Sequence, residues 1–365
     1  MKILHVGSSS SPKAVDGVNA TVWLVAKEQA FLGHQVTLML DSPPDEAAKI
    51  LADEAGFQLM HIPANTWRYD PNKLKSLLHT DTPSIVHMHS VYLPKQATLA
   101  RKIVQNQIPY VITPHGGLDS LRGKAKKFFY DLIAEKRRFS QASAITVVTP
   151  KEERTIRAFM PRYQGIIRWV ASPFDTSKFS EQIWKGNIEA KRLVFLGRYD
   201  VLHKGIDILV EIARLLPDIE FDLYGTEDSK TKKWLEKIRH NCPCNVHFNK
   251  PIFGAEKFQV LADASFYIQT SRWEGFPVSI AESMYMGLPC AVSDLPNFAE
   301  LFHQNDLGLV LPANPTKAAQ LLTEAFAQPI QVQHWSKSAQ TFAKDNFHPR
   351  KVALDYLKIY EDIAA

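Results

Sequence analysis

Two carboxylates in one short segment, residues 271–282 (SRWEGFPVSIAE), have the types and spacing that would suit a sugar nucleotide. Glu274 stands in a Gly/Pro turn after a strand-like run, and Glu282 stands in a pattern that predicts a helix. A turn frees backbone N–H groups, and a helix start adds more of them with a dipole that favours phosphate. Carboxylates accept hydrogen bonds from the hydroxyls that sugars and riboses carry. The segment therefore predicts a nucleotide-sugar site.

Two basic residues in the same half of the chain fit the other end of such a ligand. A strand-like run leads into residues 197–200 (GRYD), and residues 203–205 (HKG) follow shortly after. Open parallel sheets bind ligands at the carboxyl ends of their strands. Arg198, by its planar fork, and Lys204, as a point charge, are the cations expected opposite a diphosphate.

The elements that must position these residues alternate between short strand-like runs and helical patterns. Such a rhythm predicts parallel sheets covered by helices on both faces. The strand-like runs lie at residues 3–6, 36–40, 85–89, 110–113, 144–148, 192–196, 220–224, 246–248, 266–269 and 289–292. The rhythm breaks at residues 167–179, where we expect an irregular linker. The sequence therefore predicts two doubly wound α/β domains in tandem.

Composition is that of a globular protein large enough for two domains. The 365 residues are 45% hydrophobic and 22% charged, and no apolar run is long enough to cross a bilayer. The first residues enter a strand directly, so we expect no signal peptide, and three cysteines without a disulfide framework predict a reducing cytoplasm. The Cys242-Pro243-Cys244 run has no matching second pair, which favours incidental thiols over a metal or redox site. A net charge of +5 by itself predicts no nucleic-acid partner.

These motifs resemble those of the GT-B-fold retaining glycosyltransferases of family 4, the glycosyl transferase group 1 set, over nearly the whole chain. The specific matches lie in the second half, at residues 197–207, 274–277 and 287–289 and at Glu282. The looser matches lie in the first half, at Gly17, residues 86–89 (VHMH) and residues 113–116 (TPHG). Asp16 and Thr226 depart from glycines of the family pattern, and Thr226 borders the base pocket, so the resemblance does not identify the nucleotide base.

The resemblance implies an α/β fold of the GT-B class, with two Rossmann-like doubly wound domains facing a cleft. It implies an acceptor-side domain at residues 1–171 and a nucleotide-sugar-binding domain at residues 172–345. A C-terminal helix in residues 346–365 would return to the first domain. We expect that helix to supply apolar contacts from Val352, Leu354, Leu357, Ile359, Tyr360 and Ile363.

The resemblance also implies a role for each matched residue. Arg198 and Lys204 would bind the donor diphosphate and Glu282 the ribose hydroxyls. Glu274 would bind hydroxyls of the donor sugar, and His115 would lie near the transferred sugar. Backbone groups would complete the donor site at Gly17, Gly275, Phe276, Pro277 and Val278. Attack on the same face of the sugar, with the leaving phosphate taking the proton, needs no protein nucleophile, and neither metal nor cofactor is expected.

The activity implied is transfer of a sugar from a nucleotide-diphosphate sugar to a hydroxyl of a saccharide or lipid-linked acceptor, in polysaccharide or glycolipid biosynthesis. One alternative is a GT-B sugar-nucleotide epimerase, which would need a carboxylate or histidine placed as a base. Another is an inactive partner subunit, which would be expected to have lost Arg198, Lys204 or Glu274. All three residues are present.

Two further features leave alternatives open. His87 and His89 alternate on a strand and so share one side, which lines either the cleft or the core. A zinc site of these two with His115 lacks a Cys or carboxylate to complete it.

The segment from Leu121 to Arg138 interleaves seven basic residues with aromatic and aliphatic ones. That pattern suits either peripheral contact with an anionic inner membrane face or a helix packed by its apolar side with solvated lysines.

Overall fold

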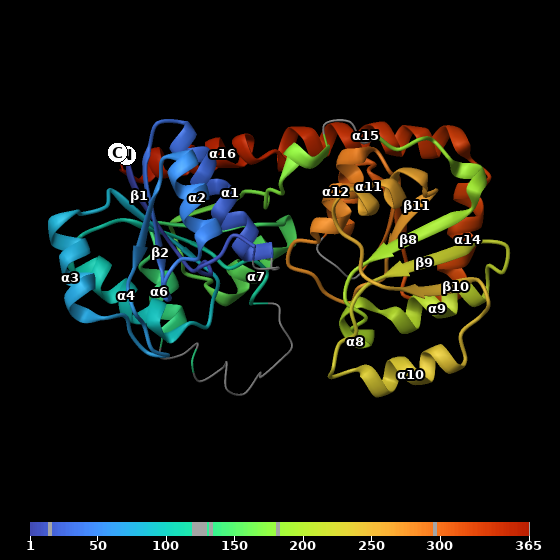
Figure 1. Cartoon of the computed structure of the whole chain (residues 1–365), viewed down its shortest axis with the longest axis horizontal. Helices are drawn as coiled ribbons and strands as arrows, with labels where there is room; N and C mark the ends of the chain where they lie inside the picture. The colour runs from blue at the N-terminus through green and yellow to red at the C-terminus, as the bar shows by residue number, and fades with distance from the viewer. Residues whose placement is uncertain (14–16, 119–129, 131–133, 180–182, 295–297, 365) are drawn as a thin grey trace. The chain divides into compact units, whose positions relative to one another are not determined.

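The computed structural model describes residues 1–13, 17–118, 130, 134–179, 183–294 and 298–364 (Figure 1). The chain divides into two compact units. The first unit comprises Met1–Asp175 and Phe347–Ala365, and the second comprises Thr176–Asn346. Each unit holds one parallel sheet.

In the first unit, strands and helices alternate along the chain. They are β1 (Lys2–Val6), α1 (Gly17–Phe31), β2 (Gln35–Leu40), α2 (Glu46–Ala55), β3 (Gln58–His61), α3 (Pro71–Thr80), β4 (Ile85–His89), α4 (Pro94–Gln105), β5 (Tyr110–Thr113), α6 (Lys136–Ser140), β6 (Ala144–Val147), α7 (Pro150–Phe159) and β7 (Ile166–Trp169). Within the described residues the sheet has seven parallel strands in the order β3-β2-β1-β4-β5-β6-β7. This order reverses direction between β1 and β4, which creates a ligand-binding edge in folds of this kind.

Helices cover both faces of this sheet because successive side chains of a strand point to opposite sides. Ile3 belongs to a core cluster with Val22 and Ala26 of α1, whereas Leu4 belongs to a separate cluster with Leu99 of α4. Several helices start at a side-chain cap, in which an Asp, Thr or Asn oxygen accepts a hydrogen bond from the backbone N–H three residues on.

The C-terminal helix α16 (Pro349–Ala364) packs against α1 of the first unit. Its buried face comprises Val352, Ala353, Tyr356, Leu357, Ile359 and Tyr360. The expectation that Leu354 would supply an apolar contact is wrong, since this side chain is 40% exposed, and Tyr356 lies on the buried face instead. The expected return of the last helix to the first domain is confirmed.

The second unit repeats the same rhythm. Its elements are the short 3-10 turns η2 (Thr176–Phe179) and η3 (Ile188–Ala190), β8 (Arg192–Leu196), α8 (Val201–Lys204), α9 (Ile206–Arg214), β9 (Glu220–Tyr224), α10 (Lys232–His240), β10 (Val246–Asn249), α11 (Gly254–Asp263), β11 (Phe266–Gln269), α12 (Val278–Met286), β12 (Cys290–Ser293), α13 (Ala299–Asn305), β13 (Gly308–Leu311), α14 (Pro315–Phe326) and α15 (Pro329–Phe347). The described sheet has six parallel strands in the order β10-β9-β8-β11-β12-β13, which reverses between β8 and β11.

Three short edge or near-edge strands, β3, β7 and β13, were not among the predicted ones. The expectation of an irregular stretch throughout residues 167–179 is wrong at its start, because residues 166–169 pair in parallel with β6. Each of the three lies at an edge of its sheet and has only four residues, and none is buried along its whole length, whereas predicted strands of the same length, such as β5 and β11, are fully buried. Such short runs carry little periodicity, and their pairing depends on a neighbouring strand that is distant in the chain.

Candidate functional site

The residues that follow β8 and β11 meet because these strands are neighbours in the second sheet. Phe266 and Tyr267 of β11 pair with Leu193 and Val194 of β8. The strand order reverses at this point, and in open parallel sheets ligands bind outside the carboxyl ends of the strands at such a reversal. The predicted site segments at 197–205 and 271–282 both lie at this edge.

The segment after β8 is shaped by a short capped helix and a glycine. Asp200 accepts a hydrogen bond from the backbone N–H of His203 at 3.0 Å and so caps α8. Gly205 ends that helix at φ 64°, in the left-handed region. A Cβ at this position would lie 2.0 Å from the carbonyl oxygen of Thr270. Only glycine therefore lets this segment close against the residue that follows β11.

The segment after β11 is tied down by Arg272. Its guanidinium makes a two-pronged ion pair with Asp207 at the start of α9, at 2.9 and 2.7 Å. It also donates to the carbonyl oxygens of Val201 and Leu202 in α8. Because Arg is rigid and planar at this end, the contact fixes the turn that carries Glu274.

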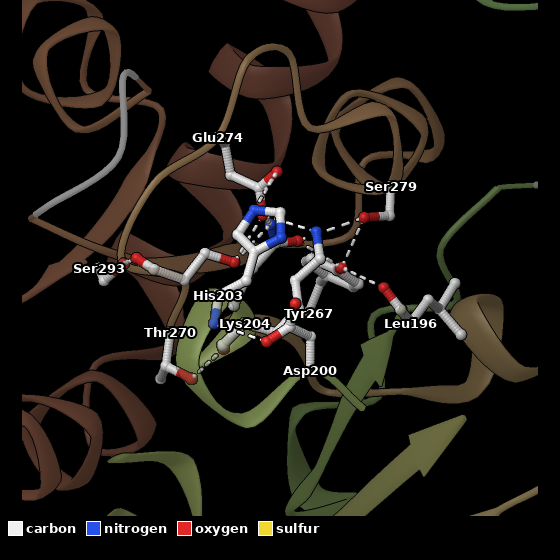
Figure 2. Close-up of polar contacts among 11 residues, drawn as sticks. Leu196, Asp200, His203, Lys204, Tyr267, Thr270, Glu274, Ser279 and Ser293 are labelled. Atoms are coloured by element: carbon white, nitrogen blue, oxygen red, sulfur yellow. Dashed lines mark hydrogen bonds and ion pairs between the residues drawn. The ribbon is translucent and has the colours of Figure 1, made fainter. Parts of the chain in front are cut away.

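Lys204 and Glu274 form a nearly buried ion pair at the centre of this edge (Figure 2). The Lys204 ammonium lies 2.6 Å from Oε1 of Glu274, and the side chains are 14% and 8% exposed. The hydroxyl of Ser271 and the amide of Gln269 donate to the same oxygen at 2.6 and 2.7 Å. Burial raises the pKa of Glu274, but Lys204, His203 and the Ser271 hydroxyl outweigh it and leave that pKa below its ordinary value. The carboxylate is therefore held ionised and in one orientation.

His203 borders the pair. Its ring stacks on Trp273 with centroids 4.8 Å apart and planes 7° from parallel, and its Nε2 lies 3.7 Å from Oε2 of Glu274. Burial lowers the pKa of His203, although the neighbouring carboxylate acts in the opposite direction. At neutral pH the imidazole of His203 is therefore uncharged and lies beside the ion pair.

The other predicted donor-site residues have separate partners. Arg198 is half-exposed and pairs with Asp228 at 3.2 Å. Glu282 lies on α12 and accepts from the Lys257 ammonium at 2.7 Å. The turn at residues 275–277 runs into the first residue of α12, Val278, so Gly275, Phe276, Pro277 and Val278 bring a helix N-terminus to the same segment as Glu274. The structure thus joins Lys204 to Glu274 and leaves Arg198 and Glu282 nearby in sequence but in other ion pairs.

In the first unit, His115 lies in a loop held by a buried carboxylate. Glu152 of α7 accepts hydrogen bonds from the backbone N–H of Gly116 at 2.5 Å and of Val148 at 2.8 Å. His115 itself has φ 54°, and burial lowers its pKa to about 3. Gly17 is the first residue of α1, while residue 16 of the expected paired-glycine loop lies outside the described residues.

His87 and His89 are both fully buried, which decides their placement in favour of the core. The ring of His87 bonds the Tyr360 hydroxyl at 2.6 Å and the Thr113 hydroxyl at 2.7 Å. Within the described part of the chain, the histidines close enough for a shared metal ion are His5, His87 and His89, so His115 does not join the other two in such a set. Each ring nitrogen of these three already has a hydrogen-bond partner in the protein.

Comparison with known proteins agrees with this geometry in both units. The model described as "Glycosyltransferase Family 4" matches residues 15–178, and that of "Glycosyl transferases group 1" matches residues 190–328. The chain belongs to the group 1, family 4 glycosyltransferases. It is an enzyme that transfers a sugar from a nucleotide-sugar donor.

Individual relatives of this glycosyltransferase are distant. A GDP-mannose:cellobiosyl-diphosphopolyprenol alpha-mannosyltransferase of Xanthomonas campestris is 22% identical over 343 residues, covering 90% of this chain and 87% of that one. The GtfA subunit of a peptide N-acetylglucosaminyltransferase of Streptococcus agalactiae is 30% identical over 128 residues, which is 34% of this chain and only 24% of that one. The solved structure of Anabaena HepE with UDP has a TM-score of 0.76 at 15% identity, covering 99% of this chain and 100% of that one, and shares the GT-B fold.

The basic segment from Leu121 to Arg138 lies largely outside the described residues, which include only residue 130 and residues 134–138 of it. Arg138 is not a surface cation of this glycosyltransferase. It is 2% exposed, pairs with the buried Glu135 at 2.8 Å and donates to the carbonyl oxygen of Ser90. None of the described helices is long and apolar enough to cross a membrane.

Sequence reasoning missed several residues that build the site. Gln269 and Ser271 flank the carboxylate, and Arg272 anchors its loop. A signal was present, because polar residues directly after a buried strand in a parallel sheet lie at its binding edge. Glu152 could have been found from the Thr149 to Glu152 spacing, which is typical of a helix start.

Proposed function

We propose that this glycosyltransferase holds the nucleotide-diphosphate sugar at the carboxyl ends of β8 and β11 and transfers the sugar with retention to a hydroxyl. The observation that carries the proposal is the buried Lys204–Glu274 pair. Burying two charges is costly unless both are fully hydrogen-bonded. A pair at the edge of a sheet where ligands bind is therefore more than a stabilising contact.

The two members of the pair would contact different parts of the donor. An ammonium has three N–H donors, and Glu274 takes one of them, so Lys204 can also bind phosphate oxygens. The Glu274 carboxylate, oriented by Ser271 and Gln269, would accept hydrogen bonds from hydroxyls of the sugar. The N-terminus of α12 after Pro277 would add backbone N–H groups toward phosphate.

Arg198 and Glu282 would complete the donor site after exchanging their partners. Arg198 would leave Asp228 to bind the diphosphate by its fork, which half exposure allows. Glu282 would leave Lys257 and accept from the ribose hydroxyls. Gly17 at the start of α1 would admit the phosphate closely, since glycine has no side chain to exclude it.

We propose for these residues the reaction step that the family resemblance implies. The bond between the anomeric carbon and the departing phosphate oxygen breaks while the acceptor oxygen bonds to that carbon from the same face. The acceptor's proton passes to the departing phosphate oxygen. Arg198 and Lys204 stabilise the negative charge that develops on the leaving diphosphate. His115, uncharged at neutral pH, would border the transferred sugar rather than carry a proton.

The proposal is tested by Lys204→Met, with Lys185→Met as the control. Lys185 is a lysine of the same unit whose ion pair with Asp263 is largely exposed. Nucleoside diphosphates of uracil, guanine and adenine are screened by thermal shift, since ligand binding raises the melting temperature. We expect Lys204→Met to lower kcat/KM with the identified donor by on the order of 100-fold. Near-normal transfer by a folded Lys204→Met enzyme would place the donor elsewhere.

The two carboxylates are separated by calorimetry. Glu282→Gln should weaken binding of the free nucleoside diphosphate, because its expected partner is the ribose. Glu274→Gln should leave that binding largely intact and weaken binding of the intact donor. Equal losses for both ligands in both variants would contradict the assignment.

For the acceptor we propose a saccharide or lipid-linked hydroxyl, in polysaccharide or glycolipid biosynthesis, with the enzyme in the cytoplasm and peripheral on the inner membrane face. Support comes from the basic residues of segment 121–137 and from the lipid-linked substrate in the name of the Xanthomonas relative. Sedimentation with anionic and with zwitterionic vesicles tests the membrane contact. If equal amounts of the enzyme sediment with both vesicle types, the proposed membrane contact is wrong.

Retention is tested separately, by determining the anomeric configuration of the product by NMR.

A further inference from the structure

A chain of hydrogen bonds runs through the core of the first unit and ends at His115. At its inner end, Oε1 of Gln29 on α1 lies 2.8 Å from Nε2 of His5 on β1. Nδ1 of His5 lies 3.1 Å from Nε2 of His89 on β4, and Nδ1 of His89 lies 3.0 Å from Nε2 of His115. The inner three side chains are fully buried.

The chemistry of neutral imidazole gives this chain a direction. A neutral ring has one N–H donor and one acceptor nitrogen, so the roles of its two nitrogens are coupled. With the Gln29 amide oriented so that its oxygen faces His5, that oxygen accepts, which places the proton of His5 on Nε2 and leaves its Nδ1 as an acceptor. His89 must then donate from Nε2, and His115 in turn must donate from its own Nε2. The outward Nδ1 of His115 is left without a proton.

We propose that Gln29, His5 and His89 are positioning residues that hold His115 in the tautomer with the proton on Nε2, so that its Nδ1 accepts a hydrogen bond from a hydroxyl of the transferred sugar. This inference rests on the proposed function, which puts His115 beside that sugar. It assigns a role to three buried side chains that do not themselves touch the substrate.

The surrounding structure keeps the chain in register. Gln96 donates to the carbonyl oxygen of His89 at 2.8 Å. A Cβ at Gly7 would lie 2.6 Å from the same oxygen, so only glycine fits there. Glu152 holds the loop on the other side of His115 through the N–H of Gly116. The ring nitrogens are therefore kept at hydrogen-bonding distance by contacts from several elements.

The three imidazoles of this hydrogen-bonded chain are also held in their neutral form. Burial lowers the pKa of His5 to about 4, that of His115 to about 3 and that of His89 well below its ordinary value. A proton added to His5 or His89 would leave two N–H groups facing each other at one of the contacts. Neutral rings satisfy one another at each step, and the direction set by Gln29 is carried to the surface.

His87 offers a matched comparison with His89. Both lie on β4, both are fully buried, and their rings are 4.0 Å apart. His87, however, bonds Tyr360 and Thr113 and is not part of the chain. Replacing either residue should cost comparable stability, but only His89 should change the tautomer of His115.

The experiment measures ring ¹⁵N shifts and couplings of His115 by NMR in ¹⁵N-histidine-labelled enzyme, assigned with His115→Gln. We expect protonated Nε2 in the parent and in His87→Asn, and a mixture of tautomers in His89→Asn and in Gln29→Leu. Gln29→Leu, at the far end of the chain, provides the test if His89→Asn does not fold. We further expect kcat of Gln29→Leu to fall on the order of 10-fold with little change in the donor KM.

Three results would overturn the inference. One is a parent His115 with the proton on Nδ1 or on both nitrogens in similar amounts. Another is an unchanged tautomer in Gln29→Leu. The third is one equivalent of a transition metal in the purified enzyme, because His5, His87 and His89 would then be ligands. Failure of the proposed function can be distinguished from failure of this inference. If only the proposed function is wrong, Gln29→Leu still changes the tautomer of His115 but does not lower kcat.

Discussion

The buried histidines of the first unit should make that unit lose stability as the pH falls from 7.5 to 5.5. The pKa of histidine in an unfolded chain is about 6.5. In the folded unit, burial lowers it to about 4 for His5, to about 3 for His115, and well below the ordinary value for His87 and His89. The folded state thus stays neutral while the unfolded state takes up protons. The free energy of unfolding must therefore decrease as the pH falls.

The size of this effect follows from the pKa difference. Over this range each such histidine contributes about 1.4 kcal/mol, because the unfolded chain titrates and the folded one does not. The four together give up to about 5 kcal/mol, which is comparable to the whole stability of many domains. In the described part of the second unit, His203 is the histidine with a clearly lowered pKa, so that unit should change by up to about 1.4 kcal/mol.

Hydrogen exchange with mass spectrometry can measure the two units separately in one sample. Opening free energies, corrected for intrinsic exchange rates, are compared for peptides covering β1 and β4 and for peptides covering β8. His5→Asn should reduce the pH difference in the first unit by about 1.4 kcal/mol. An equal shift in both units would refute the reasoning, as would a shift in the first unit below about 1 kcal/mol.

Two stability predictions follow from matched pairs. Gly205→Ala should destabilise strongly, because its Cβ would overlap a backbone carbonyl oxygen, whereas Gly56→Ala meets no atom within 4 Å and should cost about 1 kcal/mol of backbone strain. Arg138→Met should cost about 3–5 kcal/mol by removing one partner of a buried ion pair and its hydrogen bond to Ser90, while Arg137→Met on the exposed side of α6 should change stability by under about 0.5 kcal/mol. Urea denaturation measures both pairs, and similar losses within a pair would contradict the packing described.

The sequence predicted the parts of the fold that local patterns specify. Strands such as residues 85–89 and 192–196 are apolar runs flanked by turn residues, and their alternation with helices indicated two parallel sheets. Arg198 and Lys204 could be placed at a binding edge because they follow such a strand directly. The last helix could be assigned to the first domain only through the family resemblance, since its partner α1 lies more than 300 residues earlier.

The side-chain contacts could not be predicted in the same way. Lys204 and Glu274 are 70 residues apart, and His5 and His89 are 84 apart. Each pair comes together because the strand order places β8 beside β11 and β1 beside β4, and a local pattern does not contain that order. Once β1 is known to lie beside β4, the parallel register pairs His5 with His87. The clustering of His5, His87 and His89 therefore follows from the strand order.

Next to the proposed ligand contacts, the two units bury polar groups in different ways, and the difference matches what each would bind. The second unit buries charge, and the Glu274 carboxylate is tolerable there because three donors surround one oxygen. The first unit buries neutral imidazoles, which satisfy one another in sequence and need no counter-ion. A diphosphate needs full positive charge. The ion pair of the second unit contains such a charge, and the neutral imidazoles of the first unit do not. Sugar hydroxyls need acceptors of fixed direction, and a chain that ends at the outward nitrogen of His115 provides an uncharged one.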